Sequence, residues 1–252
     1  MKKKPHEIIY GIHAVEAAIR NQPENILQVF VQQGRNDNRI KTIFNLARNS
    51  GISIQAISSE RLKEKCPGAR HQGVVADIRQ GGTTTLSLDA ILQRQSVLLL
   101  VLDEVQDPHN IGACLRTADA AGVDAVIVSK NRSPALTPVI RNVASGGAET
   151  VPYIMVSNLA RALEQIRQSN VWVIGTSGDC EQTIYSASAG QRLALVMGSE
   201  GKGMRRLTRE TCDELVSIPM QGTVESLNIS VAAAVCLYEI RRQQQTATAG
   251  AR

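Results

Sequence analysis

The stretch IPMQGTVESLNISVAAAV, residues 218–235, joins a loop containing a proline to a helix of small residues. The loop begins on an apolar segment, turns at Gly222, and gathers polar side chains just before the Ala-rich run of residues 231–235. Asn228 or Ser230 can cap this helix by accepting hydrogen bonds from the free N–H groups of its first turn. The stretch therefore predicts either a simple helix cap or a functional site at the start of a helix.

Two other segments combine glycines with polar side chains. DPHNIGACLRT, residues 107–117, and LVMGSEGKGM, residues 195–204, each follow or include an apolar run. The glycine pattern GxxGxG of the second segment is not the dinucleotide fingerprint, and Lys202 lacks the frame of a phosphate-binding loop. Nucleotide hydrolysis is thus weakly supported. Glycines after a strand allow either a plain tight turn or a close approach of the backbone to a ligand.

Unbroken apolar runs alternate with helical patterns across residues 96–243. Such a pattern is typical of a parallel sheet covered on both faces, which predicts an α/β domain. Expected strands are residues 97–102, 125–128, 171–175, 193–197 and 214–218, and expected helices are residues 111–121, 159–168 and 231–242. Ligands bind these sheets in loops at the carboxyl ends of strands, where all three segments lie.

Residues 1–80 show the same alternation on a smaller scale and predict a separate compact α/β unit. Its expected helices are residues 12–19 and 39–50, and its expected strands are residues 26–32, 52–57 and 73–77. RQGGTTT at residues 79–85 breaks the pattern with glycines and polar residues, so we expect a linker over residues 81–95. Low complexity predicts a flexible tail at residues 244–252.

The charge distribution points to a polyanionic partner for the first third of the chain. Of 252 residues, the first 80 hold 13 Lys or Arg and 7 Asp or Glu, an excess of six positive charges. The remainder holds 15 basic and 16 acidic residues. Part of the excess is a solubilising run at residues 2–4, which leaves nucleic acid and a plain basic tail both open. Aromatic residues make up only 3%, which argues against a single-strand binder that stacks bases on exposed rings.

The number of cysteines and the hydropathy of the chain indicate where in the cell the protein is located. The five cysteines form no CxxC pair and are odd in number, so neither a zinc site nor a disulfide framework is suggested. No stretch reaches the length of a membrane span, and the N-terminus lacks a signal-peptide core. We therefore expect a cytoplasmic protein that does not act at a membrane.

The three segments, in this order, resemble the SpoU branch of the SPOUT methyltransferases, which methylate ribose 2'-hydroxyls of RNA with S-adenosylmethionine. Asn110, Gly112 and Arg116 match the first family motif, residues 198–201 match the second, and residues 222–228 match the third. The opening YGIHAVEAAI, residues 10–19, is also similar to members that carry an additional RNA-binding domain. The resemblance thus covers most of the chain.

This resemblance implies a fold and an activity. The C-terminal domain is expected to be a parallel-sheet SPOUT domain with a trefoil knot, although general topology rules argue against knots. The N-terminal domain is expected to be a small α/β RNA-binding domain like that of a large-subunit ribosomal protein. The chain is most similar to members that methylate a guanosine of 23S ribosomal RNA, so this RNA or a ribosomal precursor is the expected partner. A homodimer is implied, in which Arg116 of the partner subunit reaches the cofactor pocket.

The resemblance also implies residue roles. Residues expected at the cofactor are Gly198, Ile218 and Leu227, with Thr176, Gly201 and Met220 as neighbours. Residues expected to serve catalysis are Arg116, Asn110, Glu200, Ser226 and Asn228. No metal is expected, because methyl transfer from a sulfonium is an in-line displacement.

Arg116 needs a specific chemical role, because a guanidinium stays protonated in ordinary settings. We expect Arg116 to bind the RNA phosphate beside the target and to help the hydroxyl lose its proton, in preference to abstracting the proton itself. Ser226 would orient Arg116, and the Glu200 carboxylate would pair with it. His109 is a less favoured general base.

Two other functions remain open at this point. A catalytically silent RNA-binding or assembly protein would keep the fold, although the intact motif residues favour an enzyme. A transfer-RNA ribose methyltransferase would keep the chemistry, although the additional N-terminal domain points toward ribosomal RNA.

Overall fold

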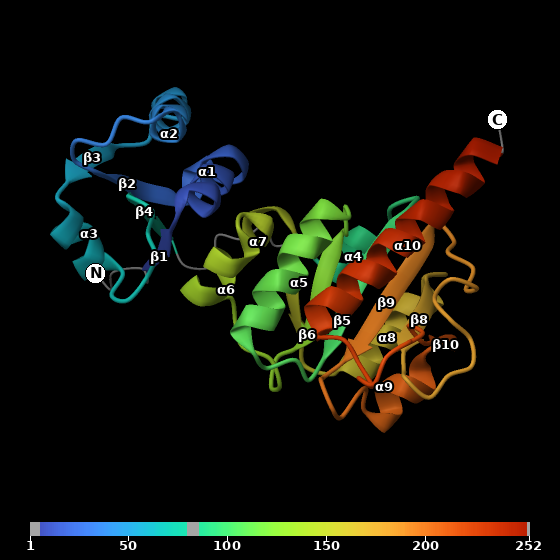
Figure 1. Cartoon of the computed structure of the whole chain (residues 1–252). Helices are drawn as coiled ribbons and strands as arrows, with labels where there is room; N and C mark the ends of the chain where they lie inside the picture. Colours follow the sequence, from blue (N-terminus) through green and yellow to red (C-terminus); the bar gives the residue numbers. More distant parts are fainter. Residues whose placement is uncertain (1–5, 80–85, 251–252) are drawn as a thin grey trace. The chain divides into compact units, whose positions relative to one another are not determined.

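The computed structural model of the protein describes residues 6–79 and 86–250 (Figure 1). The chain divides into two compact units. The first unit comprises residues 136–150 and the described part of residues 1–85, and the second comprises residues 86–135 and the described part of residues 151–252. In the described part of the chain, no helix has the length and apolar character needed to cross a membrane.

The first unit contains a four-stranded mixed sheet of order β1-β4-β2-β3. Strand β4 is antiparallel to β1 and β2, whereas β2 and β3 are parallel. The elements from residues 6–79 are β1 (His6–Tyr10), α1 (Ile12–Asn21), the short 3₁₀ helix η1 (Pro23–Asn25), β2 (Ile26–Gln32), α2 (Asn38–Asn49), β3 (Ile54–Ile57), α3 (Ser59–Lys65) and β4 (Val74–Arg79). The expected elements are present, and β1, η1 and α3 are additional.

Both faces of this sheet are covered. Side chains alternate between faces along a strand, so Val29 and Val31 of β2 join the core beneath α1 and α2, while Phe30 joins the core with Leu62 of α3. Strand β2 is therefore apolar on both faces. This explains why its apolar pattern predicted the strand span correctly.

Residues 136–150 form two helices of the first unit that the sequence did not predict. They are α6 (Pro138–Ala144) and α7 (Gly147–Thr150), which contact β1 and α1. Arg141 of α6 is buried, and its Nη1 donates to Glu149 Oε1 at 2.8 Å while its Nε lies 3.6 Å from Glu7 Oε1. The two helices are too short to show a clear helical period in the sequence. The buried polar cluster of Arg141, Glu149 and Glu7 holds them against the rest of the first unit.

The second unit is built on a six-stranded sheet of order β10-β8-β9-β5-β6-β7. All of its pairings are parallel, which confirms the expected parallel-sheet domain. The strands are β5 (Val97–Asp103), β6 (Ala125–Ser129), β7 (Tyr153–Val156), β8 (Trp172–Thr176), β9 (Arg192–Gly198) and β10 (Glu214–Val216). The helices are α4 (Leu88–Leu92), α5 (Pro108–Ala120), α8 (Leu159–Gln168), α9 (Arg206–Thr211) and α10 (Ile229–Gly250).

Helices cover both faces of this sheet. Val97, Leu99 and Val101 of β5 share one core with α4 and α8. Alternate residues of β5 point to the opposite face, where α5 and α10 lie side by side (Figure 1). The all-buried pattern of β5 is typical of a strand covered on both faces.

Two expected boundaries differ from the structure. Residues 81–85 of the expected linker lie outside the described residues, but residues 88–92 of the same segment form helix α4, with Leu88, Ile91 and Leu92 buried. The apolar spacing i, i+3, i+4 explains this helix. Helix α10 also continues to Gly250, through most of the segment expected to be a flexible tail. Part of that continuation is anchored, because Gln244 Nε2 donates to the carbonyl of Gly190.

The buried cluster of the first unit generates a pH prediction. Burial raises the pKa of Glu149 to about 7 from 4.5, although the Arg141 guanidinium acts in the opposite direction. A carboxyl with a raised pKa binds its proton more tightly when folded, so its contribution to stability is full below about pH 4.5 and is lost as the pH rises through about 7. The Glu149→Gln variant should lose this part of the pH dependence. Urea unfolding followed by circular dichroism at pH 5 and pH 8 measures it.

Glu16→Gln is the matched control, because Glu16 forms an exposed ion pair with Arg20 on the same unit. Its unfolding should keep the wild-type difference between the two pH values. An unchanged difference in Glu149→Gln would show that Glu149 is ionised in the folded protein throughout this range.

Candidate functional site

The Glu200 carboxylate joins the three predicted motif segments at the carboxyl edge of the second sheet. Its Oε1 atom accepts from Asn228 Nδ2 at 2.7 Å, from the backbone N–H of Ile229 at 3.1 Å, and from Asn110 Nδ2 at 3.4 Å. Asn228 Nδ2 also donates to Asn110 Oδ1 at 2.9 Å. The three side chains come from the starts of α5 and α10 and from the loop after β9.

Asn228 also caps helix α10. Its Oδ1 accepts from the backbone N–H of Ser230 at 3.0 Å and from the Ser230 hydroxyl at 2.7 Å. The capping interpretation of Asn228 is thus confirmed, and it does not compete with the site, because the amide nitrogen of the same side chain reaches Glu200.

The glycines after β9 form a tight turn. Gly203 N–H donates to Ser199 O at 2.9 Å, and Ser199 N–H donates to Gly203 O at 3.2 Å. Gly201 and Gly203 have φ values of 78° and 65°, which residues other than glycine rarely adopt. A Cβ atom on Gly198 would lie 2.0 Å from the backbone carbon of Gly203. The backbone that approaches Gly198 so closely is therefore the chain's own.

The residues expected at the cofactor lie around the ends of three adjacent strands. Thr176 ends β8 and Gly198 ends β9, while Ile218 lies two residues beyond β10. Thr176 Oγ1 donates to the carbonyl of Val196 at 3.3 Å. Ile218, Met220 and Leu227 are half-buried, whereas Gly201 is exposed.

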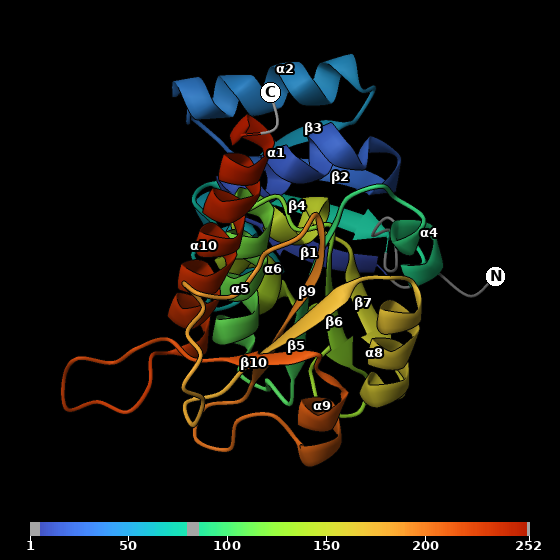
Figure 2. The same cartoon turned by 90° about the vertical axis from the view of Figure 1, so that its right-hand side faces the viewer.

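The loop that contains the third motif extends away from the rest of the second unit (Figure 2). Residues 221–226 of this loop are all exposed, and Val224 has an exposed fraction of 61%. Ser217, at the start of the loop, pairs with the β8–β9 connection, since its N–H donates to the carbonyl of Gln182 at 2.8 Å. The loop begins at the edge strand β10 and returns to the start of α10 beside Asn110.

The expected partners of Arg116 are not formed within this chain. Arg116 is exposed on α5, and it has no hydrogen bond or ion pair with any residue the structure describes. Glu200 and Arg116 form no ion pair within this chain, where Glu200 Oε1 instead accepts from the two asparagines and the N–H of Ile229, so their pairing stays a prediction. Ser226 is exposed and forms no hydrogen bond within the described residues, so it does not orient Arg116 here.

One structural pair of the site was missed by sequence reasoning. Asp103, at the end of β5, is fully buried and accepts from the backbone N–H of Arg205 at 2.9 Å and from Arg205 Nε at 2.8 Å. This pair holds the loop after β9 against the end of β5. The signal was an aspartate at the end of the apolar run LLLVLD, residues 98–103, which predicts a buried charge with a partner but does not identify the partner.

Two family models match this chain. The SpoU rRNA Methylase family matches residues 97–238, and RNA 2'-O ribose methyltransferase substrate binding matches residues 8–81. The chain is 53% identical over 241 residues to the 23S rRNA (guanosine-2'-O-)-methyltransferase RlmB of Pasteurella multocida (strain Pm70), which covers 94% of this chain and 98% of that protein.

Solved structures show the same architecture. The crystal structure of an RNA 2'-O ribose methyltransferase superposes with a TM-score of 0.81 at 27% identity and covers 95% of this chain and 89% of that one. The SpoU methyltransferase AviRb from Streptomyces viridochromogenes, in complex with the cofactor AdoMet, gives a TM-score of 0.79 at 24% identity and covers 94% of this chain and 90% of that one. The second likeness supports the fold.

The close packing at Gly198 generates a prediction. In Gly198→Ala the new methyl group would lie 2.0 Å from the Gly203 carbon and 2.2 Å from the Met204 nitrogen, so the turn that carries Glu200 must move. We expect the free energy of unfolding to fall by more than about 2 kcal/mol. Thermal unfolding measures this change. Gly222→Ala is the control, because a Cβ there meets no atom within 4 Å and the residue has no positive φ. Equal stability of the two variants would contradict the packing argument.

Proposed function

Because the chain belongs to the SpoU rRNA methylase family, we propose that it transfers a methyl group from S-adenosylmethionine to the ribose 2'-hydroxyl of a guanosine in 23S ribosomal RNA. The observation that carries the proposal is that Asn110 and Asn228, from the first and third motifs, both donate to the same carboxylate oxygen of Glu200 in the second. Relatives named for this reaction match nearly the whole chain, which supports the substrate. A ribosomal RNA substrate supports a cytoplasmic location for the enzyme.

The chain's own residues fit S-adenosylmethionine. Backbone N–H and C=O groups at the ends of β8, β9 and β10 offer the polar contacts that an adenosine needs, and half-buried Ile218, Met220 and Leu227 offer apolar surface for its ring. Thr176, Gly198 and Gly201 complete the proposed cofactor set. When bound, this cofactor supplies an electrophilic methyl group on a sulfonium. No residue has to bind a metal for such a displacement.

Arg116 is the proposed RNA-side residue. Its exposed guanidinium has no partner among the described residues, so all of its donors are available to a phosphate of the substrate. A positive charge held beside the ribose stabilises the 2'-oxygen as its proton leaves. The proton passes to solvent or to a nearby acceptor, because a guanidinium does not accept it.

The Glu200 network has a positioning role in this mechanism. Asn228 uses its amide nitrogen on Asn110 and Glu200, and its oxygen accepts from Ser230. These groups therefore hold the two helix starts and the β9 loop in place, so that the cofactor residues and Arg116 keep their spacing. The second carboxylate oxygen of Glu200 and the Ser226 hydroxyl have no hydrogen bond within the described residues, which leaves both available to RNA or to a second subunit.

We assign residues 1–80 to RNA substrate binding and residues 96–243 to methyl transfer, and we count helix α4 and the end of α10 with the methyl-transfer domain. The matched family models and the six excess positive charges of the first 80 residues support this division. Helices α6 and α7 belong structurally to the first unit, so the functional boundaries do not follow the physical ones.

We further propose a homodimer with a knotted methyl-transfer domain. Val231 and Tyr238 lie two turns apart on one face of α10, beside α5, and have exposed fractions of 49% and 55%. An exposed apolar stripe of this kind is suited to association with a second copy. The return of the chain from edge strand β10, past the β8–β9 connection, to the start of α10 beside Asn110 supports the proposed knot, because a knotted chain must pass back across a neighbouring connection.

Arg116→Ala tests the reaction. Methyl transfer should fall at least about 100-fold, because the variant loses the charge beside the ribose oxygen. The affinity for S-adenosylmethionine, measured by calorimetry, should stay close to that of the wild type. Near-wild-type turnover would remove Arg116 from the mechanism.

A 2'-deoxy substitution tests the reaction class. An RNA fragment with one 2'-deoxyribose at the target guanosine should bind but accept no methyl group, as mass spectrometry of the product would show. Methylation of that fragment on its base would overturn the proposed reaction.

Mixing two inactive variants tests the shared site. If Arg116 of the partner subunit completes each site, a dimer of Arg116→Ala with Asn228→Ala contains one intact site. Random mixing makes half of the dimers mixed, so activity should recover to about a quarter of the wild-type level per subunit. Absence of recovery, despite subunit exchange shown by mass spectrometry, would show that each site is built within one chain.

A further inference from the structure

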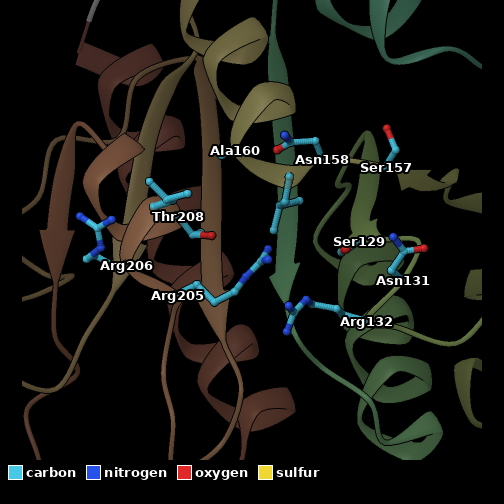
Figure 3. Close-up of a pocket in the computed structure, with 11 residues that line it drawn as sticks. Ser129, Asn131, Arg132, Ser157, Asn158, Ala160, Arg205, Arg206 and Thr208 are labelled. Atoms are coloured by element: carbon cyan, nitrogen blue, oxygen red, sulfur yellow. The ribbon is translucent and has the colours of Figure 1, made fainter.

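A hollow lined by arginines lies at the carboxyl ends of the strands of the second sheet, outside the motif residues. It has a volume of about 500 Å³, within the range of small-ligand sites. Its lining comes from the ends of β6 and β7, the start of α8, and α9 with the residue before it (Figure 3). The lining residues that carry the argument are Ser129, Arg132, Asn158, Ala160, Arg205 and Arg206.

The lining includes three arginines and no acidic residue. Two of the arginines are anchored from outside it. Arg205 is held by the buried carboxylate of Asp103 at 2.8 Å, and Arg132 donates to Glu104. Arg206 pairs with Glu210 at 3.0 Å and is 80% exposed along its side chain. Because each guanidinium has five N–H donors, these ion pairs orient the arginines and leave donors available to an anion.

A serine at the wall of the hollow adds a second and independent observation. Ser129, at the end of β6, is only 4% exposed, yet its hydroxyl has no hydrogen bond within the part of the chain that the structure describes. Figure 3 shows it at the wall of the hollow near Asn131 and Arg132. Because Ser129 lines the hollow and its hydroxyl has no partner among the described residues, this hydroxyl can donate to an acceptor oxygen of a ligand bound there.

The start of α8 points the same way. Asn158 caps the helix by accepting from the N–H of Arg161 at 3.1 Å, so this side chain leaves the first two helical N–H groups, of Leu159 and Ala160, uncapped. Leu159 and Ala160 both line the hollow. Uncapped N–H groups at a helix start favour an anion.

The hollow adjoins the candidate site. Asp103, which holds Arg205, is the register partner of Gly198, and Glu200 follows two residues later. An RNA chain whose target ribose lies near Asn110 and Glu200 therefore has its neighbouring backbone within reach of the hollow. The phosphodiester is the group of that backbone that combines an anionic charge with several acceptor oxygens.

Resting on the proposed function, we propose that this hollow binds a phosphodiester of the RNA substrate next to the methylated nucleotide. Arg132 and Arg206 contact the phosphate oxygens, Ser129 donates its hydroxyl, and Arg205 fixes the wall through Asp103. The phosphate bound in the hollow determines whether the RNA on the 5' or the 3' side of the target nucleotide lies across the ends of β6 and β7. It therefore determines the direction of the RNA chain over the site.

The double variant Arg132→Gln/Arg206→Gln tests the proposal, with Arg94→Gln as its control. Arg94 also forms an ion pair on the second unit, with Asp124 at 2.5 Å, but it precedes β5 and lies at the opposite edge of the sheet. RNA binding to a 23S fragment that the wild type methylates is measured from 50 to 300 mM salt. The log–log salt slope of the double variant should fall by about 0.7 to 0.9 for each phosphate that the variant no longer neutralises. Arg94→Gln should keep the wild-type slope.

Ser129→Ala distinguishes binding in the hollow from an effect of general surface charge. It removes no charge, so it should raise the KM for RNA severalfold, leave kcat within about twofold, and leave the salt slope unchanged. S-adenosylmethionine affinity should be unaffected in all three variants. A lower kcat with unchanged KM for RNA would overturn the assignment of Ser129 to phosphate binding.

Methylphosphonate substitution locates the phosphate. Fragments carrying one neutral methylphosphonate at each position around the target are bound to the wild type and to the double variant. At one flanking position the substitution should weaken wild-type binding about tenfold and the double variant far less, because the double variant lacks the arginines that bind this phosphate. Equal reductions at every position would overturn the proposal.

Two further outcomes are informative. If inorganic phosphate protects the hollow from hydrogen exchange but the salt slope for RNA is unchanged in the double variant, the hollow takes a free phosphate and the RNA proposal is wrong. If the wild type methylates no ribose in any RNA, the proposed function fails first, whereas normal methylation with an unchanged salt slope defeats only this inference.

Discussion

One carboxylate oxygen, Glu200 Oε1, joins the parts of the candidate site. It receives hydrogen bonds from residues 90 positions earlier and 28 positions later in the chain. For this meeting to occur, the chain after β9 must turn back within a few residues, and the chain after β10 must return from the sheet edge to its centre. The glycines of the β9 loop serve the first requirement and the helix cap at Asn228 serves the second. The glycine turn and the helix cap, which are local backbone features, therefore also determine the geometry of the site.

This arrangement divides the polar residues into two groups with different tasks. Asn110, Glu200 and Asn228 satisfy one another, so their main energetic role is to hold three segments in register. Arg116 is left without a partner among the described residues, as a group that meets a substrate should be. A guanidinium already paired with Glu200 would have to break that pair before binding phosphate. Within this chain no such pair has to break, because Glu200 Oε1 accepts from amide and backbone donors instead.

Most of the regular elements could be predicted from sequence, because their apolar period is strong. Strand β2 and helix α8 match their predicted spans, since both bury a full set of apolar side chains. The missed elements are all short. They are the helices η1, α3, α4, α6, α7 and α9 and the strands β1 and β7. Some are held by contacts distant in sequence, such as Arg141 of α6 with Glu7 of β1. The site residues were found by motif resemblance, but their partners were not. Spacing shows that Glu200 and Arg116 are near one edge of the sheet, yet only the structure shows which donors reach Glu200 first.

The order of the chain does not follow the two physical units. Residues 136–150 lie inside the matched methylase region, yet their buried Arg141 and Glu149 pack in the unit that holds the substrate-binding region. The chain therefore leaves the second unit after β6, contributes α6 and α7 to the first, and returns at β7. Strands β6 and β7 are also the strands whose ends line the hollow. Asn131 and Arg132 of the hollow lie on the connection from β6 to α6, so the segment that leads from the second unit into the first also lines the proposed phosphate site.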